Sequence, residues 1–267
     1  MTVTAFPTNP YRPAAARRTA VRAVGKLMRT ELKLFLREPI SAFFSVIFPA
    51  VLIVVLGGAL PGFLDPNDDL DGRRPIDIYL PITLALAIAT VALVSLLTNL
   101  TAAREKGLLR RLSTTPASPV MLLVAQLAVN LLALVAGSVL AVTAAWIAFD
   151  VRLPENAPGL VVAFTLGSIA MVAVALLIAA VTPNSRASMG VGSLVYYPMM
   201  FAAGVWTPGP AMPDVVRRVA DYTPLGAASQ AMQDAWAGDW PRLLHLVVLV
   251  GYTVVLGGLA ARLFRWS

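Results

Sequence analysis

Six long stretches of this sequence are apolar and contain no Asp, Glu, Lys or Arg. A helix that crosses the hydrocarbon core of a bilayer needs about 20 such residues in a row. The six stretches are residues 40–60, 78–100, 120–149, 159–181, 189–206 and 243–261. We therefore predict an all-α integral membrane protein with six transmembrane helices. The fifth is the least regular, because Pro198 interrupts it.

Residues 20–39, which precede the first apolar stretch, have an amphipathic pattern. Basic residues recur there at intervals of three or four and fall on one face of a helix, while apolar residues cover most of the opposite side. These basic residues are Arg22, Lys26, Arg29, Lys33 and Arg37. Such a helix lies along a membrane surface with its cations among anionic headgroups. We predict an interfacial helix over 20–39, and a disordered tail over the proline-containing segment 1–19.

The segment between the second and third apolar stretches predicts another short helix. Leu108, Leu109 and Leu112 have amphipathic helical spacing, and Pro116 ends the pattern. A charged helix joined directly to two spans is suited to transmit the movement of a partner protein to those spans. The alternative is that its basic residues only anchor the loop on one side of the membrane.

The segment between the fifth and sixth stretches is more apolar than a simple loop. Residues 207–240 hold apolar side chains at helical spacing, and Thr223 can cap a helix whose first residue is Pro224. We predict two short helices that dip back into the membrane and form a re-entrant hairpin before the last span.

The charges of the chain are sorted by side. Charged residues make up only 13% of the sequence and hydrophobic residues 58%, with a formal net charge of +7. If the N-terminus is cytoplasmic, the inward segments carry 15 Lys/Arg and three acidic residues, and the outward loops carry six Arg and 11 Asp/Glu. Basic residues near spans resist translocation, so both termini are predicted to lie in the cytoplasm. The protein itself is predicted to lie in the inner membrane of a bacterial cell. Nucleic acid is not an expected partner.

Several kinds of chemistry are excluded by the residues available. The chain has no Cys and one His, His245, which leaves no disulfide, no thiolate nucleophile and no His-based metal site. Gly25-Lys26 is followed by Leu27 and lacks the remaining residues of a phosphate-binding loop. Paired carboxylates are absent from the spans, so a proton-coupled mechanism lacks its usual groups. We expect the energy source to be a separate polypeptide, and His245 to be a hydrogen-bonding residue of helix packing.

Polar side chains within the spans are candidates for a translocation path. In the second stretch Thr90 and Thr98 share one side, with Asn99 beside them. In the third, Gln126 and Asn130 lie one turn apart. Amides in hydrocarbon require partners, so these groups either bond helices to one another or line a path.

The fifth stretch adds a cluster of aromatic residues and methionines around its proline. Its candidate path residues are Tyr196, Tyr197, Met200 and Phe201. Such side chains offer polarizable surface for variable amphipathic ligands. Aromatic residues also populate membrane interfaces, so an interfacial role is the alternative.

Two motifs carry a resemblance to a known family. The first is Glu105-Lys106-Gly107, followed by Leu109 and by Thr115-Pro116. The second is Gly204-Val205-Trp206-Thr207-Pro208, followed by Met212-Pro213 and Thr223-Pro224. In this order along six spans, they resemble the motifs of permease subunits of type 2 ABC exporters, except that Leu108 stands where threonine is usual. The length is similar to that of the daunorubicin-efflux and multidrug branch.

The resemblance implies partners and site residues. Two permease chains, identical or different, would form the path for a small lipophilic substrate among membrane lipids. Two cytoplasmic ATPase subunits would bind the ATP and Mg²⁺, so this chain has no catalytic residue or cofactor of its own. The implied ATPase-docking residues are Glu31, Arg37, Glu38, Arg104, Glu105, Lys106, Gly107, Leu109, Arg110 and Arg111. The implied outer gate comprises Trp206, Pro208, Pro213 and Pro224.

Two other functions are open at the level of sequence. One is export of a polysaccharide or glycolipid, whose permeases have a similar topology. The other is a membrane scaffold that transports nothing. An intramembrane hydrolase would need paired catalytic groups within a span, and none is present.

Overall fold

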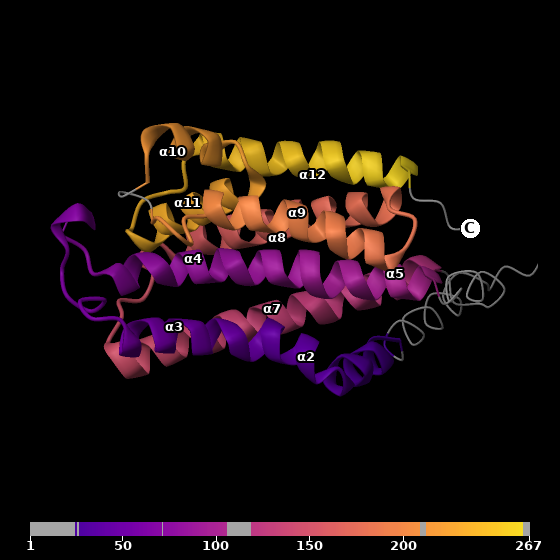
Figure 1. Ribbon diagram of the computed structural model, residues 1–267, viewed down its shortest axis with the longest axis horizontal. Coiled ribbons are helices and arrows are strands. Elements are labelled where there is room, and N and C mark those ends of the chain that lie inside the picture. The colour runs from indigo at the N-terminus through magenta and orange to yellow at the C-terminus, as the bar shows by residue number, and fades with distance from the viewer. Residues whose placement is uncertain (1–24, 26, 71, 106–118, 209–211, 264–267) are drawn as a thin grey trace, which may run out of the picture.

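The protein is a bundle of long helices that lie side by side (Figure 1). The computed structural model describes residues 25, 27–70, 72–105, 119–208 and 212–263. Over these residues there is no β-strand, which confirms the all-α prediction. The predicted tail over 1–19 and the predicted short helix at 108–112 lie outside the described residues.

The first long helix is preceded by a shorter one that rests on the bundle. Residues 27–37 are helical, and the buried side chain of Phe35 packs against Val129 and Ala133. The long helix Pro39–Ala59 then follows. It comprises α2 (Pro39–Ala42), a π-helical turn at Phe43–Ile47 and α3 (Phe48–Ala59).

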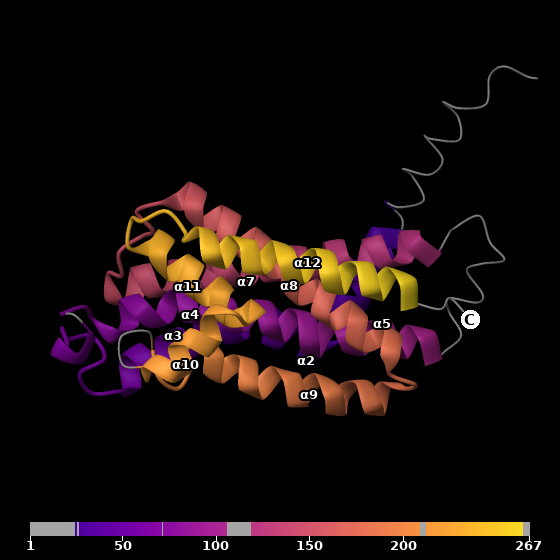
Figure 2. The ribbon, with the colours of Figure 1, turned by 90° about the horizontal axis from the view of Figure 1, so that it is seen from above.

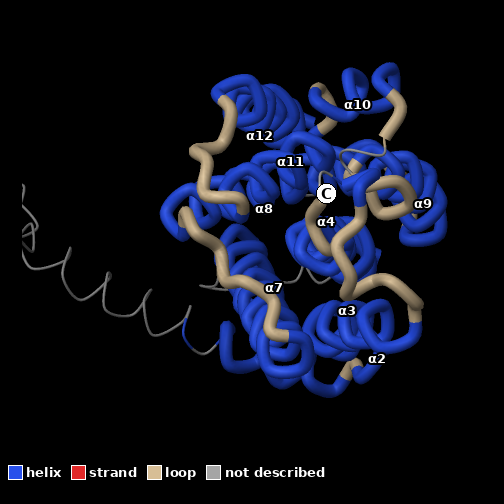
Figure 3. Tube along the Cα trace, turned by 90° about the vertical axis from the view of Figure 1, so that its left-hand side faces the viewer, coloured by secondary structure: helices blue, strands red, loops and turns tan. Residues whose placement is uncertain are grey.

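One helix lies at the centre of the bundle. The helix Pro75–Glu105 comprises α4 (Pro75–Thr90), a π-helical turn at Val91–Leu96 and α5 (Leu97–Glu105). Of its most apolar stretch, 94% is buried within the protein, because the helix is apolar on all sides and is enclosed by α3, α7, α8, α9 and α11 (Figure 3).

Small residues allow the outer helices to approach closely. These helices are α7 (Pro119–Phe149), α8 (Ala157–Val181) and α12 (Leu243–Leu263). A Cβ added at Gly137 of α7 would collide with the carbonyl oxygen of Ser45, and one at Gly167 of α8 would lie 2.7 Å from the Cβ of Ala228. Such contacts are typical of helices that pack in membranes.

Five helices among the described residues are long and apolar enough to cross a membrane. They correspond to every predicted span except the fifth. That region forms α9 (Ser185–Ala202), which runs along one edge of the bundle (Figure 2). Its Ser, Gly and Tyr residues make it less apolar than the other five. That α9 crosses the membrane stays a prediction.

Two short helices connect α9 to α12, as predicted. They are α10 (Asp214–Asp221) and α11 (Pro224–Trp236). The Thr223 side chain caps α11 by accepting a hydrogen bond of 3.2 Å from the Gly226 N–H, and Pro224 follows as the first helical residue. Helix α11 is buried against α4 and α8. Its entry into a membrane stays a prediction.

The bundle has two chemically different ends. We call the end that carries residues 27–37, Glu105 and the turn between α8 and α9 the basic end. The opposite end, with residues 60–74, the connection between α7 and α8, and α10, is called the hairpin end (Figure 1).

Candidate functional site

The last turn of the central helix is attached to the C-terminus of α8 at the basic end. Arg104 donates one hydrogen bond of 2.7 Å from Nη1 to the carbonyl oxygen of Ala179, and another from Nη2 to that of Thr182. The last carbonyls of a helix have no partner within the helix and carry partial negative charge. A guanidinium is therefore well matched to this position.

The adjacent residue is attached to the N-terminus of α9. The carboxylate of Glu105 accepts hydrogen bonds from the Ser185 backbone N–H at 2.8 Å and from the Ser185 hydroxyl at 2.7 Å. The Asn184 side chain accepts from the Ala187 N–H at 2.8 Å. Both groups satisfy N–H donors that the first turn of a helix leaves free, and a carboxylate is favoured by the helix dipole.

Arg104 and Glu105 thus form what we call the Arg104–Glu105 clamp. The two consecutive side chains hold both ends of the turn 182–184 that joins α8 to α9. A further hydrogen bond joins the hydroxyls of Thr182 and Ser188 across the same turn. Two adjacent residues at the end of the central helix are therefore bonded to two other helices.

The other predicted docking residues have different environments. Arg37 and Glu38 are exposed. Glu31 is partly buried instead of fully solvated, and its carboxylate accepts a hydrogen bond from the Gln126 side chain. Burial raises the pKa of Glu31, opposed by this hydrogen bond and assisted by the charge of Glu38. The remaining predicted docking residues, Lys106, Gly107, Leu109, Arg110 and Arg111, lie outside the described residues.

Some of the polar residues predicted for the path take part in hydrogen bonds between helices. The Thr90 and Tyr196 hydroxyls are 2.8 Å apart and join α4 to α9. Ser95 donates to Asn130 Oδ1 at 2.9 Å and joins the central helix to α7. The Asn130 amide in turn donates to the Gln126 carbonyl at 2.9 Å. We call these residues the polar seam.

The polar seam still contains one unsatisfied group. Among the described residues, no hydrogen-bond partner lies within reach of Gln126 Oε1, although this atom is buried. Thr98 bonds the Val94 carbonyl of its own helix, and Asn99 is partly buried. The π-helical turn Val91–Leu96 lies between Thr90 and these residues. Apolar periodicity contains no signal for such a turn, and sequence reasoning missed it.

The predicted aromatic cluster on α9 is divided between two faces. Tyr196 is turned toward the polar seam, whereas Tyr197 and Phe201 are 64% and 44% exposed on the outer surface. Met200 is partly buried. Tyr196 and Tyr197 do not share one face, because adjacent residues point about 100° apart on a helix.

Comparison with known proteins identifies the family. The sequence model of the ABC-2 type transporter family matches residues 22–235, which include the helix at 27–37, the clamp, the polar seam and the hairpin. The chain belongs to the ABC-2 type transporter family. It is accordingly the membrane-spanning permease component of an ABC transporter and a multi-pass membrane protein, without an ATPase domain within the matched region. No curated protein matches the chain.

The residues predicted for the outer gate of this permease lie at the hairpin end and differ in exposure. Trp206 and Pro213 are exposed, Pro208 is partly exposed and Pro224 is buried. One contact that joins this region is between other residues. Ser229 of α11 donates a hydrogen bond of 2.7 Å to the Ala203 carbonyl, just after α9.

A cluster of ionisable residues around the buried His245, at the hairpin end of the permease, was not predicted. His245 is 1% exposed, and its Nε2 makes a hydrogen bond of 3.1 Å to the Asp221 carboxylate. Its Nδ1 lies 3.8 Å from the Asp234 carboxylate, which also accepts a hydrogen bond of 3.4 Å from the Arg242 N–H. Burial raises the pKa of Asp234, opposed by the charges of Arg242 and His245. The hydrogen-bonding role predicted for His245 is confirmed, and its hydrogen-bond partner, Asp221, comes from α10. Among the described residues, the buried Nδ1 atom has no hydrogen-bond partner.

Proposed function

We propose that this permease is the path-forming subunit of an ATP-driven exporter of lipophilic or amphipathic molecules, such as drugs, antibiotics or lipid-like metabolites. Two copies of a cytoplasmic ATPase subunit dock at the basic end, and a second permease chain completes the path. The assembly lies in the bacterial inner membrane with both termini of the chain in the cytoplasm. The asymmetry of charge between the two ends supports this orientation.

The Arg104–Glu105 clamp is the observation that carries this proposal. Residues 106–118, which hold the rest of the family motif, follow Glu105 directly in the sequence. A displacement of this segment by a docked ATPase acts on the central helix and, through two side chains, on α8 and α9. The Thr90–Tyr196 bond attaches α9 to the central helix a second time, nearer the middle of the bundle.

The polar seam and the outer face of α9 are suited to a path for amphipathic substrates. A buried acceptor without a partner, such as Gln126 Oε1, fits a place where a polar group of a substrate or a water binds. The exposed Tyr197 and Phe201 offer apolar surface either to a substrate dissolved in lipid or to the second permease chain.

Reconstitution tests the proposal. The permease is purified with the ATPase that co-purifies with it and placed in inside-out vesicles, and accumulation of an anthracycline such as daunorubicin is followed by its fluorescence. We expect accumulation that depends on ATP and is lost when the phosphate-binding lysine of the ATPase is replaced by Ala. Vesicles that contain the permease alone should neither hydrolyse ATP nor accumulate the dye. Uphill movement by the permease alone under a proton gradient would overturn the proposal.

A further inference from the structure

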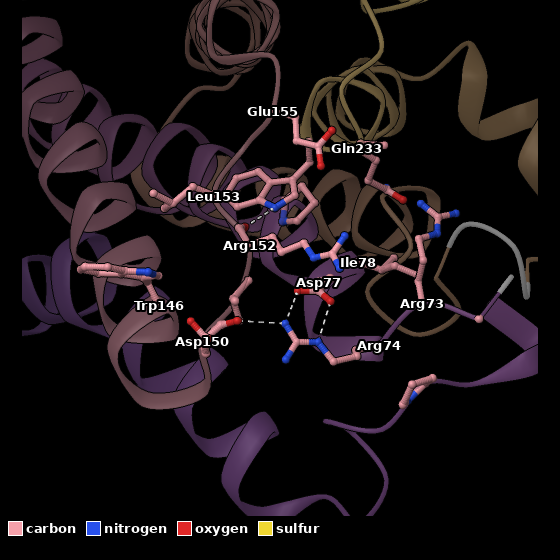
Figure 4. Close-up of a pocket in the computed structure, with 16 residues that line it drawn as sticks. Arg73, Arg74, Asp77, Ile78, Trp146, Asp150, Arg152, Leu153, Glu155 and Gln233 are labelled. Atoms are coloured by element: carbon pink, nitrogen blue, oxygen red, sulfur yellow. Dashed lines mark hydrogen bonds and ion pairs between the residues drawn. The ribbon is translucent and has the colours of Figure 1, made fainter.

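A cavity of about 900 Å³ opens at the hairpin end, away from the polar seam and from the clamp (Figure 4). Its walls come from the loop before α4, the first turns of α4, the end of α7 with the connection to α8, and the end of α11. This volume is in the range of pockets that bind small molecules, about 300–1,000 Å³. Its lining combines three arginines with Trp146 and Trp236.

One wall of the cavity is fixed by an arginine whose hydrogen bonds are already made. Arg74 forms two hydrogen bonds with the Asp77 carboxylate, at 2.8 Å and 2.9 Å, and donates to the carbonyls of Phe149 at 3.3 Å and Asp150 at 3.1 Å. This network ties the start of α4 to the end of α7. It also neutralises Arg74, which is therefore part of the wall and not a free cation.

The opposite wall holds the connection between α7 and α8 in place. The indole N–H of Trp236, a nearly fully buried residue, donates a hydrogen bond of 3.0 Å to the Arg152 carbonyl. The Asn156 N–H donates to the Ala235 carbonyl at 3.1 Å. The backbone of Arg152 is thus anchored, which limits the positions that its side chain can reach.

Arg152 is the cation that faces the centre of the cavity. Figure 4 shows its side chain extended across the cavity, above Asp77 in this view and toward Arg73. Within the part of the chain that the structure describes, Arg152 forms no ion pair, and Asp77 is occupied by Arg74. Glu155 and Asp150 lie nearer the edges of the cavity (Figure 4). The middle of the cavity therefore offers planar N–H donors without a bound carboxylate.

The rim beside Arg152 is apolar. Trp146 is 51% exposed and Leu153 is 53% exposed, and both line the cavity. An exposed tryptophan near the end of a membrane helix is typical of the level of lipid headgroups. A molecule bound at Arg152 can therefore extend an apolar tail over these two side chains into the bilayer.

We propose that this cavity binds the anionic headgroup of an amphiphile, with a phosphate or carboxylate on Arg152 and an apolar tail against Trp146 and Leu153. A guanidinium binds such groups through two parallel hydrogen bonds, which an ammonium does not provide. The site goes beyond the export function, because headgroup binding does not require that the chain transports anything. The ligand comes either from the outer leaflet or from the path as an exported substrate.

Binding of short-chain lipids to the detergent-solubilised permease tests the site. Dihexanoyl phosphatidylglycerol and dihexanoyl phosphatidylcholine are titrated while tryptophan fluorescence is recorded. We expect tighter binding of phosphatidylglycerol, competition by inorganic phosphate at higher concentration, and about tenfold weaker binding in Arg152→Ala, with partial recovery in Arg152→Lys. Arg218→Ala is the matched control, because Arg218 is an exposed arginine of α10 at the same end.

Two results would overturn the proposal. One is equal affinity of the two lipids for the unmodified permease. The other is unchanged affinity for phosphatidylglycerol in Arg152→Ala, with that variant shown to be folded by its melting temperature. A transport measurement on the complete transporter then identifies the source of the ligand. A raised KM for an anionic amphiphile in Arg152→Ala marks an exit-side substrate site, and an unchanged KM marks a site for bilayer lipid.

Discussion

Replacing Arg104 perturbs the clamp at its better buried half. Arg104→Ala removes two hydrogen bonds from a charged donor to the last carbonyls of α8. Such bonds contribute about 1.5–3 kcal/mol each, and the lower value applies here because the side chain is partly exposed. We expect a loss of about 3 kcal/mol in the free energy of unfolding, and about half as much in Arg104→Lys, whose single ammonium reaches one carbonyl.

The assay for this prediction combines stability with coupling. Unfolding by SDS in mixed micelles measures the free energy, and Arg186→Ala is the control, because Arg186 is exposed in the first turn of α9. In the complex that we propose with an ATPase, Arg104→Ala should also reduce the stimulation of ATP hydrolysis by substrate. Equal stability of Arg104→Ala and Arg186→Ala would refute the hydrogen bonds assigned to Arg104. Lost stability with intact stimulation would show that the clamp only holds the helices together.

Three further predictions concern other contacts of the permease. Thr90→Val and Tyr196→Phe should each lower the free energy of unfolding by about 1 kcal/mol. The double variant should lower it by less than the sum, because both substitutions remove the same hydrogen bond, and a double-mutant cycle measures this coupling. Gly167→Ala should destabilise by about 1–3 kcal/mol through overpacking, whereas Gly251→Ala, which meets no atom within 4 Å, should not; thermal unfolding in detergent separates them. Burial raises the pKa of Asp234 in the folded protein above its ordinary value of 3.8. The stability that this group contributes is therefore complete below pH 3.8 and declines as the pH rises through the raised pKa. Melting temperatures recorded against pH should therefore show a smaller decline for Asp234→Asn; an unchanged pH profile would contradict this account.

Local features of the fold could be predicted from the sequence because they depend on neighbouring residues. An apolar run of about 20 residues forms a membrane helix wherever it lies in the bundle. The cap at Thr223 and the proline after it act within a single turn, and the structure has both as predicted. The family motifs could likewise be read directly. The prediction was weakest for α9, where Ser, Gly and Tyr dilute the apolar signal.

The relations between distant segments were decided only by the tertiary structure. The family resemblance implied a docking role for Arg104 and Glu105, but not that they bind the two ends of a turn about 80 residues away. Glu31, predicted to face a partner, lies against Gln126, and two adjacent tyrosines of α9 lie on different faces.

Sequence by itself thus determined the membrane-spanning class, the five long apolar helices and the family of this protein. Tertiary packing decided which polar groups meet: the clamp, the polar seam, the buried His245 cluster and the cavity around Arg152. The physical reason is the range of the interactions. Hydrophobic burial and capping depend on neighbouring residues and produce a recognisable pattern in the sequence. A hydrogen bond between two helices requires only one residue on each helix and produces no such pattern.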